Sequence, residues 1–324
     1  MNMSLIHLHP NKSEDLVKIK HKCEAFMKEW KIEKSMDAKD FLQKFKVFFF
    51  DCDGVLWRGN EVIKGAVEVI EKLLKENKKV YFITNNSTKS RATLLDKFHK
   101  LGFTNVKKEN ILCTSYAIAK YFIEKEEYAT GKKKIYVIGE KGICDELDSY
   151  NLSWLGSYND DDKKVIIKDD LEINVDKNIG AVVVAIDFNI NYYKIQYAHL
   201  CINDLDAEFI VSNKDATANF TSKQKWAGTG SVVASIEAVS LKKPLILGKP
   251  NLFMIERVLK DLNVHSSQIV MVGDRLDTDI HFAQNCKIKS ILVSTGVTDS
   301  NIYLNHNNLN IQPDYFMKSI SEFL

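Results

Sequence analysis

The sequence has few prolines and glycines, almost no net charge and no long apolar run. Its 324 residues include 4 Pro and 14 Gly, too few for long disordered or fibrous segments. The 45 Lys and Arg against 43 Asp and Glu leave a formal charge of +2, which argues against a protein whose affinity comes from nucleic-acid phosphates. No segment approaches the about 18 apolar residues of a membrane-spanning helix. We therefore expect neither a nucleic-acid partner nor a membrane partner.

The cysteines also exclude some classes. The 6 Cys form no CxxC pair and no regular framework, so they are interpreted as reduced thiols. The first residues lack the basic start, apolar stretch and small-residue cleavage site of a secretory signal, and a cytoplasmic location is predicted. A chain of 324 residues exceeds the usual size of one hydrophobic core, which favours two domains or one domain with a large insertion.

The first 45 residues are predicted to be a helical extension. Apolar residues recur there at helical spacing with Lys and Glu between them, namely Leu16, Ile19, Cys23, Phe26, Met27 and Trp30. Docking of this amphipathic helix on the rest of the protein is the favoured interpretation. Binding of a protein partner is the alternative.

Short apolar runs that end abruptly in polar residues recur along the chain. They lie at residues 47–50, 80–83, 245–247, 269–272 and 291–293. Such runs are typical of strands buried on both faces of a parallel sheet. Helical patterns at residues 66–74 and 252–262 separate them, as in βαβ units. We predict an α/β catalytic core over residues 46–124 and 244–324.

Residues 125–243 interrupt this repeat with their own pattern. Strands are predicted at 135–138, 181–186 and 209–211, and helices at 192–205 and 231–240. These elements indicate a second α/β unit inserted into the first. The charged stretch at 160–164 is interpreted as a solvated loop.

Acidic residues gather at two of the strand ends. Asp51 and Asp53 follow the first strand, and the turn at Gly54 lets one carboxylate attack while the other handles a proton; a plain Asp-Gly turn is the alternative. Further acids lie at 274, 277 and 279. Because these charges would repel one another, a cation is expected among them, and oxygen ligands favour Mg²⁺.

Other strand ends supply donors for a phosphate. Lys249 follows the run at 245–247, and Thr84, Asn85 and Asn86 follow the run at 80–83. In open α/β sheets ligands bind at the carboxyl edge of the strands. The sequence therefore predicts that a phosphate and a cation meet at this edge.

Four stretches in order, at residues 48–59, 83–87, 248–250 and 273–279, resemble the motifs of the haloacid dehalogenase superfamily. More narrowly, they are similar to its branch with a large α/β cap, which holds phosphoglycolate, 4-nitrophenyl and pyridoxal phosphatases. The resemblance implies a Rossmann-like core with a parallel sheet and an inserted cap over 125–243. It also implies a phosphatase that acts on small phosphorylated metabolites and forms homodimers through the cap.

The resemblance assigns roles to individual residues. Asp51 is the nucleophile that forms an aspartyl-phosphate, and Asp53 protonates the leaving oxygen and then activates water. The Asp51 carboxylate, the Asp53 backbone carbonyl and the Asp274 carboxylate hold Mg²⁺, and Asp279 supports them. The phosphate-binding residues implied are Thr84, Asn85, Asn86 and Lys249, and the substrate-specificity loop of the cap contains Asp215, Thr217, Ala218 and Asn219.

The cap loop departs from one group of relatives. Thr217, Ala218 and Asn219 stand where pyridoxal phosphatases carry Trp-His-Pro. A small substrate such as 2-phosphoglycolate, or 4-nitrophenyl phosphate, is therefore expected. The alternatives are a phosphorylated vitamin (pyridoxal 5′-phosphate or thiamine monophosphate), a phosphotransferase on the same core, and a non-catalytic scaffold that binds phosphorylated metabolites.

Two residues near the nucleophile have competing interpretations. Cys52 is expected to pack as a small apolar group, with a regulatory thiol as the alternative. Trp57 either packs or seals the cleft.

Overall fold

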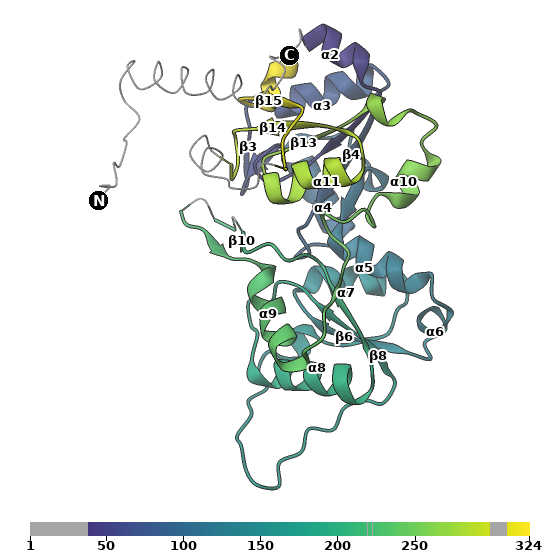
Figure 1. Ribbon diagram of the computed structural model, residues 1–324, viewed down its shortest axis with the longest axis vertical. Helices are drawn as coiled ribbons and strands as arrows, with labels where there is room; N and C mark the ends of the chain where they lie inside the picture. Colours follow the sequence, from purple (N-terminus) through teal and green to yellow (C-terminus); the bar gives the residue numbers. More distant parts are fainter. Residues whose placement is uncertain (1–37, 219, 222, 299–309) are drawn as a thin grey trace, which may run out of the picture.

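The computed structural model describes residues 38–324 except 219, 222 and 299–309. The predicted helix at 16–30 and the cap-loop residue Asn219 lie outside the described residues. Among the described residues, no helix is both long enough and apolar enough to cross a membrane. Two α/β units, which we call the core and the cap, are visible in Figure 1, the core with the purple and yellow ends of the chain and the cap in teal and green.

The core is built on a six-stranded sheet in the order β15-β14-β13-β1-β4-β5. Every neighbouring pair in it is parallel. Its strands are β1 (Val47–Phe50), β4 (Lys79–Thr84), β5 (Ile111–Cys113), β13 (Ile269–Gly273), β14 (Lys289–Val293) and β15 (Tyr315–Met317). The α/β fold with a parallel core sheet is therefore confirmed.

Helices cover both faces of the core sheet, because side chains alternate between the faces of a strand. Phe48 and Phe50 of β1 pack into one buried cluster with α3 and α4. Val47 and Phe49 pack into another with α5 and α11. The helices of the core and its border with the cap are α2 (Ala38–Lys44), α3 (Ala66–Lys75), α4 (Arg91–Lys100), α5 (Thr114–Ile123), α10 (Glu256–Asp261) and α11 (His281–Asn285), with short turns η1 (Lys108–Asn110), η3 (Ser266–Gln268), η4 (Leu276–Ile280) and η5 (Ile320–Phe323).

The cap has its own five-stranded parallel sheet in the order β12-β9-β8-β6-β7. Its strands are β6 (Lys134–Ile138), β7 (Trp154–Gly156), β8 (Ile179–Val184), β9 (Glu208–Val211) and β12 (Leu245–Ile246). The helical elements of the cap are α6 (Glu126–Ala129), α7 (Lys141–Asp148), η2 (Ser157–Asp160), α8 (Tyr192–Asp204) and α9 (Thr229–Ser240). Two small antiparallel pairs complete the structure, β2 (Trp57–Arg58) with β3 (Glu61–Val62) and β10 (Thr217–Ala218) with β11 (Trp226–Ala227).

The run at 245–247 was predicted to be a strand of the core sheet, and this prediction is wrong. Leu245 and Ile246 pair with β9 of the cap instead, and the amides of Leu247 and Gly248 continue the ladder to Val211 and Ser212 at 3.0 and 2.8 Å. The cause is that α9 ends beside the cap sheet, so the chain pairs there before it returns to the core. The helix predicted at 252–262 shortens to α10. The domain boundaries at 124/125 and 243/244 stay predictions.

The charged stretch at 160–164 is not simply a solvated loop. Asp160 is 5% exposed, and its carboxylate accepts a hydrogen bond from the Tyr136 hydroxyl at 2.8 Å. Asp161 forms an ion pair with the buried Lys194 at 2.6 Å. Long-range partners that the local sequence does not reveal therefore anchor the start of this stretch.

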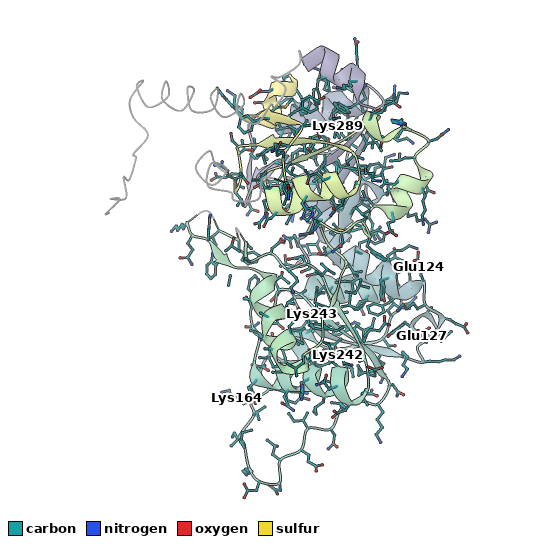
Figure 2. All side chains as sticks on the ribbon, in the orientation of Figure 1. Glu124, Glu127, Lys164, Lys242, Lys243 and Lys289 are labelled. Atoms are coloured by element: carbon teal, nitrogen blue, oxygen red, sulfur yellow. The ribbon has the colours of Figure 1, made fainter. Side chains whose placement is uncertain are left out.

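The two units share a hydrophobic cluster rather than touching only at a linker. One cluster includes Phe49 and Met271 of the core sheet as well as Val137 and Val183 of the cap sheet. Ion pairs also lie on the surface of the cap. Lys242 and Lys243, which are labelled in Figure 2, pair with Asp206 and Glu237.

Candidate active site

The site lies where β4, β1 and β13 end side by side. Phe50 of β1 is in register with Phe82 of β4 and Val272 of β13, so the residues after these strands reach the same edge of the sheet. Asp51 follows β1, Thr84 ends β4 and Asp274 follows β13. Parallel pairing thus brings together groups more than 200 positions apart in sequence.

A buried lysine bridges two of the acids. The Nζ of Lys249 donates to Asp51 Oδ1 at 2.5 Å and to Asp279 Oδ1 at 2.6 Å, and also to the backbone oxygen of Ile83 at 3.0 Å. Burial alone lowers the pKa of Lys249, but Asp279 and Asp51 together raise it above its ordinary value. Lys249 is therefore a permanent cation at the centre of the site.

Asp51 is held in an acidic, buried environment. Burial raises its pKa well above the ordinary value, Lys249 opposes this shift, and the Asp279 and Asp274 carboxylates add to it. A further positive charge nearby would strongly stabilise the ionised form of Asp51. The site therefore favours a bound cation next to Asp51.

Asp279 has both oxygens occupied by protein groups. Its Oδ1 accepts from Lys249, and its Oδ2 accepts from the backbone amides of Asp274 and Arg275, both at 3.1 Å. The turn η4, which follows β13, holds Asp279 in this position. The contacts of Asp279 therefore suit a supporting role, in which it orients Lys249 and the backbone at Asp274.

Asp274 has one carboxylate oxygen without a hydrogen-bond partner among the described residues. Its Oδ2 accepts from the Val297 amide at 2.5 Å, whereas its Oδ1 is buried without a hydrogen-bond partner. Burial and the charge of Asp279 raise the pKa of Asp274 to about 7. Among the described residues, the only other buried side-chain oxygen without a partner is Ser87 Oγ, and Ser87 lines the same site.

These acids fit a divalent cation. One carboxylate oxygen from each of Asp51, Asp274 and Asp279 lies within 4.8 Å of the other two. An orphaned carboxylate oxygen in a cluster of buried acids is the donor set that Mg²⁺ prefers. The Asp53 side chain does not belong to this cluster, so its part in metal binding rests on the predicted backbone carbonyl.

Two glycines make room for Asp274. A Cβ added at Gly54, where φ is +93°, would lie 2.6 Å from Asp274 Oδ2, and one at Gly296 would lie 1.8 Å from it. Both distances are shorter than van der Waals contact. Gly54 is therefore required both for its left-handed backbone and for the close approach of the acid.

Asp53 is oriented by Trp57, a contact that the sequence analysis missed. The indole Nε1 of Trp57 donates to Asp53 Oδ1 at 2.9 Å. The Trp57 ring is fully buried and packs edge-on against Phe98 with centroids 4.8 Å apart. Packing and hydrogen bonding together thus fix the carboxyl that was predicted to transfer protons.

In the turn after β4, some polar side-chain groups bond to the protein, and others are left to face the cavity. Asn85 accepts from the Lys249 amide at 2.8 Å and donates to the Lys249 carbonyl at 3.2 Å, so it positions that lysine. Asn86 accepts from the Thr88 amide and hydroxyl at 2.9 and 2.8 Å, and no described residue accepts from its side-chain amide. Thr84 accepts from the Asn86 amide at 3.1 Å. Thr84, Asn85 and Asn86 all line the cavity.

The cap closes the site through its β10–β11 hairpin. Asp215 accepts from Asn85 at 3.2 Å, and Arg275 of the core reaches the Thr217 carbonyl at 3.4 Å. Burial raises the pKa of Asp215. Between the hairpin and the strand ends lies a cavity of about 350 Å³, which Asp215, Thr217 and Ala218 line together with Asp51, Asp53 and Lys249.

The sequence analysis did not single out several other residues that line this cavity. They are Asn60, Thr88, Lys89, Lys97, Ile186 and Val297. Most of them come from loops and helices rather than from strand ends, so the pattern of runs ending in polar residues could not identify them. Cys52 is 1% exposed, and burial, with the charges of Asp51 and Asp53, raises its pKa well above the ordinary value, as suits a packing role.

Comparison with known proteins agrees with this geometry. A family model described as "Haloacid dehalogenase-like hydrolase" matches residues 48–153, and one described as "HAD-hyrolase-like" matches 246–323. Phosphoglycolate phosphatase 2 of Arabidopsis thaliana is 39% identical over 90% of this chain and 96% of its own. A 4-nitrophenylphosphatase of Schizosaccharomyces pombe is 34% identical over 90% and 97%. The crystal structure of a 4-nitrophenylphosphatase from Thermotoga maritima superposes with a TM-score of 0.71 at 25% identity, covering 87% of this chain and 97% of that one.

Proposed function

Because the chain belongs to the haloacid dehalogenase-like hydrolases and is a phosphoric monoester hydrolase, we propose that it releases phosphate from small metabolites through an aspartyl-phosphate on Asp51, with Mg²⁺ as cofactor. The observation that carries this proposal is the buried cluster of acids around Lys249 beside a cavity. Its orphaned Asp274 oxygen and its central lysine suit a metal and a phosphate together.

In the first step, an oxygen of Asp51 attacks the phosphorus of the substrate. The bond from phosphorus to the leaving oxygen breaks as the bond to Asp51 forms, and Asp53 gives its proton to the leaving oxygen. Trp57 holds Asp53 for this transfer through its indole N–H. Lys249, 2.5 Å from Asp51, offsets the charge that two approaching anions bring together.

In the second step, a water molecule attacks the phosphorus of the aspartyl-phosphate. Asp53, now ionised, takes a proton from that water, and the bond from phosphorus to Asp51 breaks. Inorganic phosphate leaves, and the Asp51 carboxylate is restored. The same carboxyl thus serves as acid and then as base, which returns the site to its starting protonation.

The Asp51 carboxylate, the Asp53 backbone carbonyl and the Asp274 carboxylate are the groups that would hold Mg²⁺, with Asp279 in support. When bound, the ion neutralises charge on the phosphate and on the three acids. Lys249 and the side-chain amide of Asn86 complete the binding of the phosphate oxygens. Positioning and charge neutralisation are the main contributions expected for phosphoryl transfer.

The size and lining of the cavity favour a small substrate. At about 350 Å³ it lies near the lower end of ligand pockets, which suits 2-phosphoglycolate or 4-nitrophenyl phosphate. The names of the Arabidopsis and Schizosaccharomyces relatives support the same two compounds. Thr217 and Ala218 supply no aromatic ring at the two positions where pyridoxal phosphatases carry Trp and His, so phosphorylated vitamins remain the alternative. The cap-mediated homodimer and the cytoplasmic location stay predictions.

The test is phosphate release from 2-phosphoglycolate, 4-nitrophenyl phosphate, pyridoxal 5′-phosphate and thiamine monophosphate, with Mg²⁺ and with EDTA. We expect release that requires the metal, and the highest kcat/KM for 2-phosphoglycolate. In Asp51→Asn, loss of the nucleophile should lower kcat by about 10⁴-fold or more without a change in the circular dichroism spectrum. Undiminished turnover by that variant would rule out the aspartyl-phosphate.

A further inference from the structure

Two lysines that line the active-site cavity have no anionic partner within the described part of the chain. Lys89 follows the turn after β4, and Lys97 lies on α4; both are half-buried and line the cavity. Among the described residues, neither side chain forms an ion pair or a hydrogen bond. The other two cations of the cavity are paired, because Lys249 contacts Asp51 and Asp279 and Arg275 contacts Asp277.

Lys97 is held close to Asp53, the acid that is proposed to protonate the leaving group. Its Nζ lies 4.3 Å from the centroid of the Trp57 ring, and the indole N–H of the same ring donates to Asp53 at 2.9 Å. A cation over an indole ring is held by the ring quadrupole. Lys97 therefore points to the side of the cavity at which the leaving oxygen meets Asp53.

The charge of Lys97 is poorly compensated within the protein. Burial lowers its pKa, Asp53 opposes this shift in part, and the charge of Lys89 adds to it. A half-buried ammonium group next to a second cation is stabilised when an anion enters the cavity. The proposed phosphate site already has Lys249 and Asn86, so this stabilisation is available to a second anionic group.

We propose that Lys97 and Lys89 form a subsite for a carboxylate on the leaving group, which makes the enzyme prefer phosphorylated hydroxy acids to phosphate esters of neutral alcohols. The inference rests on the proposed function, because it takes the phosphate to be at Asp51 and the leaving oxygen at Asp53. It extends that function by assigning substrate choice to residues of the core, in addition to the cap loop.

The experiment compares kcat/KM for 2-phosphoglycolate with that for 2-hydroxyethyl phosphate, which carries a hydroxymethyl group in place of the carboxylate. In Lys97→Gln we expect the ratio of the two values to fall by about tenfold to a hundredfold, the usual worth of a hydrogen bond to a charged group. Lys89→Gln should lower the ratio by a smaller factor. Lys97→Arg, which keeps the charge, should stay within about threefold of the wild type.

Lys100→Gln is the matched control, because Lys100 is an exposed lysine on the same helix. It removes the same charge away from the cavity and should leave the ratio unchanged. Thermal melts of all variants check that they are folded. If Lys97→Gln fails to fold, the ratio of the two kcat/KM values in Lys89→Gln and Lys97→Arg still tests the inference. An unchanged ratio in Lys89→Gln would then overturn it.

The outcomes separate this inference from the proposed function. Equal losses for both substrates in Lys97→Gln would mean that the lysine acts through Trp57 and Asp53, and would overturn the inference. So would an unchanged ratio, or a wild type that hydrolyses 4-nitrophenyl phosphate but not 2-phosphoglycolate, while the proposed chemistry stands. A folded wild type that releases phosphate from none of these substrates would overturn both.

Discussion

Two lysines of this chain are buried between pairs of aspartates, one in the core and one in the cap. Lys249 contacts Asp51 and Asp279 at 2.5 and 2.6 Å. Lys194, on α8, contacts Asp161 and Asp187 at 2.6 and 2.7 Å. Both lysines are at most 2% exposed, and for both the neighbouring acids raise a pKa that burial alone would lower.

The difference lies in what surrounds the two ion-pair clusters. In the cap, the remaining oxygens of Asp187 and Asp161 accept from Asn189, at 2.9 and 3.0 Å. In the core, a third acid, Asp274, keeps an oxygen to which no described residue donates, and a cavity adjoins the cluster. A buried ion pair is therefore weak evidence of a functional site. Unbalanced charge and an orphaned oxygen beside a cavity distinguish the core cluster.

Among the changes that compare the two lysine clusters, the largest effect is expected for Lys249→Met. The variant removes the cation that offsets the charge between Asp51 and the phosphate, and loss of such a group costs about 10²-fold to 10³-fold in kcat. The measurement is kcat for 4-nitrophenyl phosphate at saturating Mg²⁺. Activity within about threefold of the wild type would show that the core cluster is structural, like that of the cap.

The matching change in the cap is Lys194→Met, which leaves two acids without their cation. Breaking a buried pair in this way costs about 3–5 kcal/mol of stability. We expect a lower midpoint in urea unfolding, while kcat of the folded fraction stays near the wild-type value. A stable variant that has lost its activity would contradict the assignment of this cluster to folding.

Mg²⁺ should stabilise the protein through the core cluster alone. At a concentration about a hundredfold above its Kd, a bound ion adds about 2.7 kcal/mol to the stability of the folded state. Thermal melts with Mg²⁺ and with EDTA should differ for the wild type and for Asp187→Asn, but not for Asp274→Asn. A shift that persists in Asp274→Asn would place the ion elsewhere.

The smallest effects are expected for two aromatic side chains that donate a hydrogen bond to an aspartate, one in the core and one in the cap. Trp57→Phe removes the donor to Asp53, worth about 0.5–1.5 kcal/mol, and should lower kcat by about threefold to tenfold. Tyr136→Phe removes the donor to Asp160, 2.8 Å away, and should lower stability by a similar free energy with kcat unchanged. Urea unfolding and phosphate release on both variants test this division. Equal activity losses would contradict it.

Local patterns in the sequence were enough to predict four of the six core strands, β1, β4, β13 and β14, and the acids that follow two of them, whereas β5 and β15 were not predicted. The runs at 47–50 and 269–272 are apolar on both faces, and Asp51 and Asp274 follow them, so the burial of these strands and the position of the acids at one edge of the sheet could be predicted. The cap strands at 135–138 and 209–211 were also found, because they show the same pattern.

Contacts between distant segments could not be predicted in this way. The run at 245–247 resembles the core strands, yet it pairs in the cap, and nothing in its three residues determines the partner. Lys194 looks like any helical lysine until Asp161 and Asp187 are placed around it. The indole contact to Asp53 and the position of Lys97 depend on how α4 packs on Trp57, which no spacing along the chain encodes.

The pairing of β12 with β9 has a consequence for the exchange of caps between related enzymes. Lys249 follows directly on a strand whose register the cap determines, since Gly248 donates to Ser212 at 2.8 Å. A chimera joined at residue 243 would combine a foreign β9 with the native β12. A change in the register between these two strands would move Lys249 away from Asp51 and Asp279. An exchanged cap should therefore include Leu245 and Ile246. The segment that must be exchanged to change substrate choice then extends almost to Lys249, which belongs to the catalytic machinery.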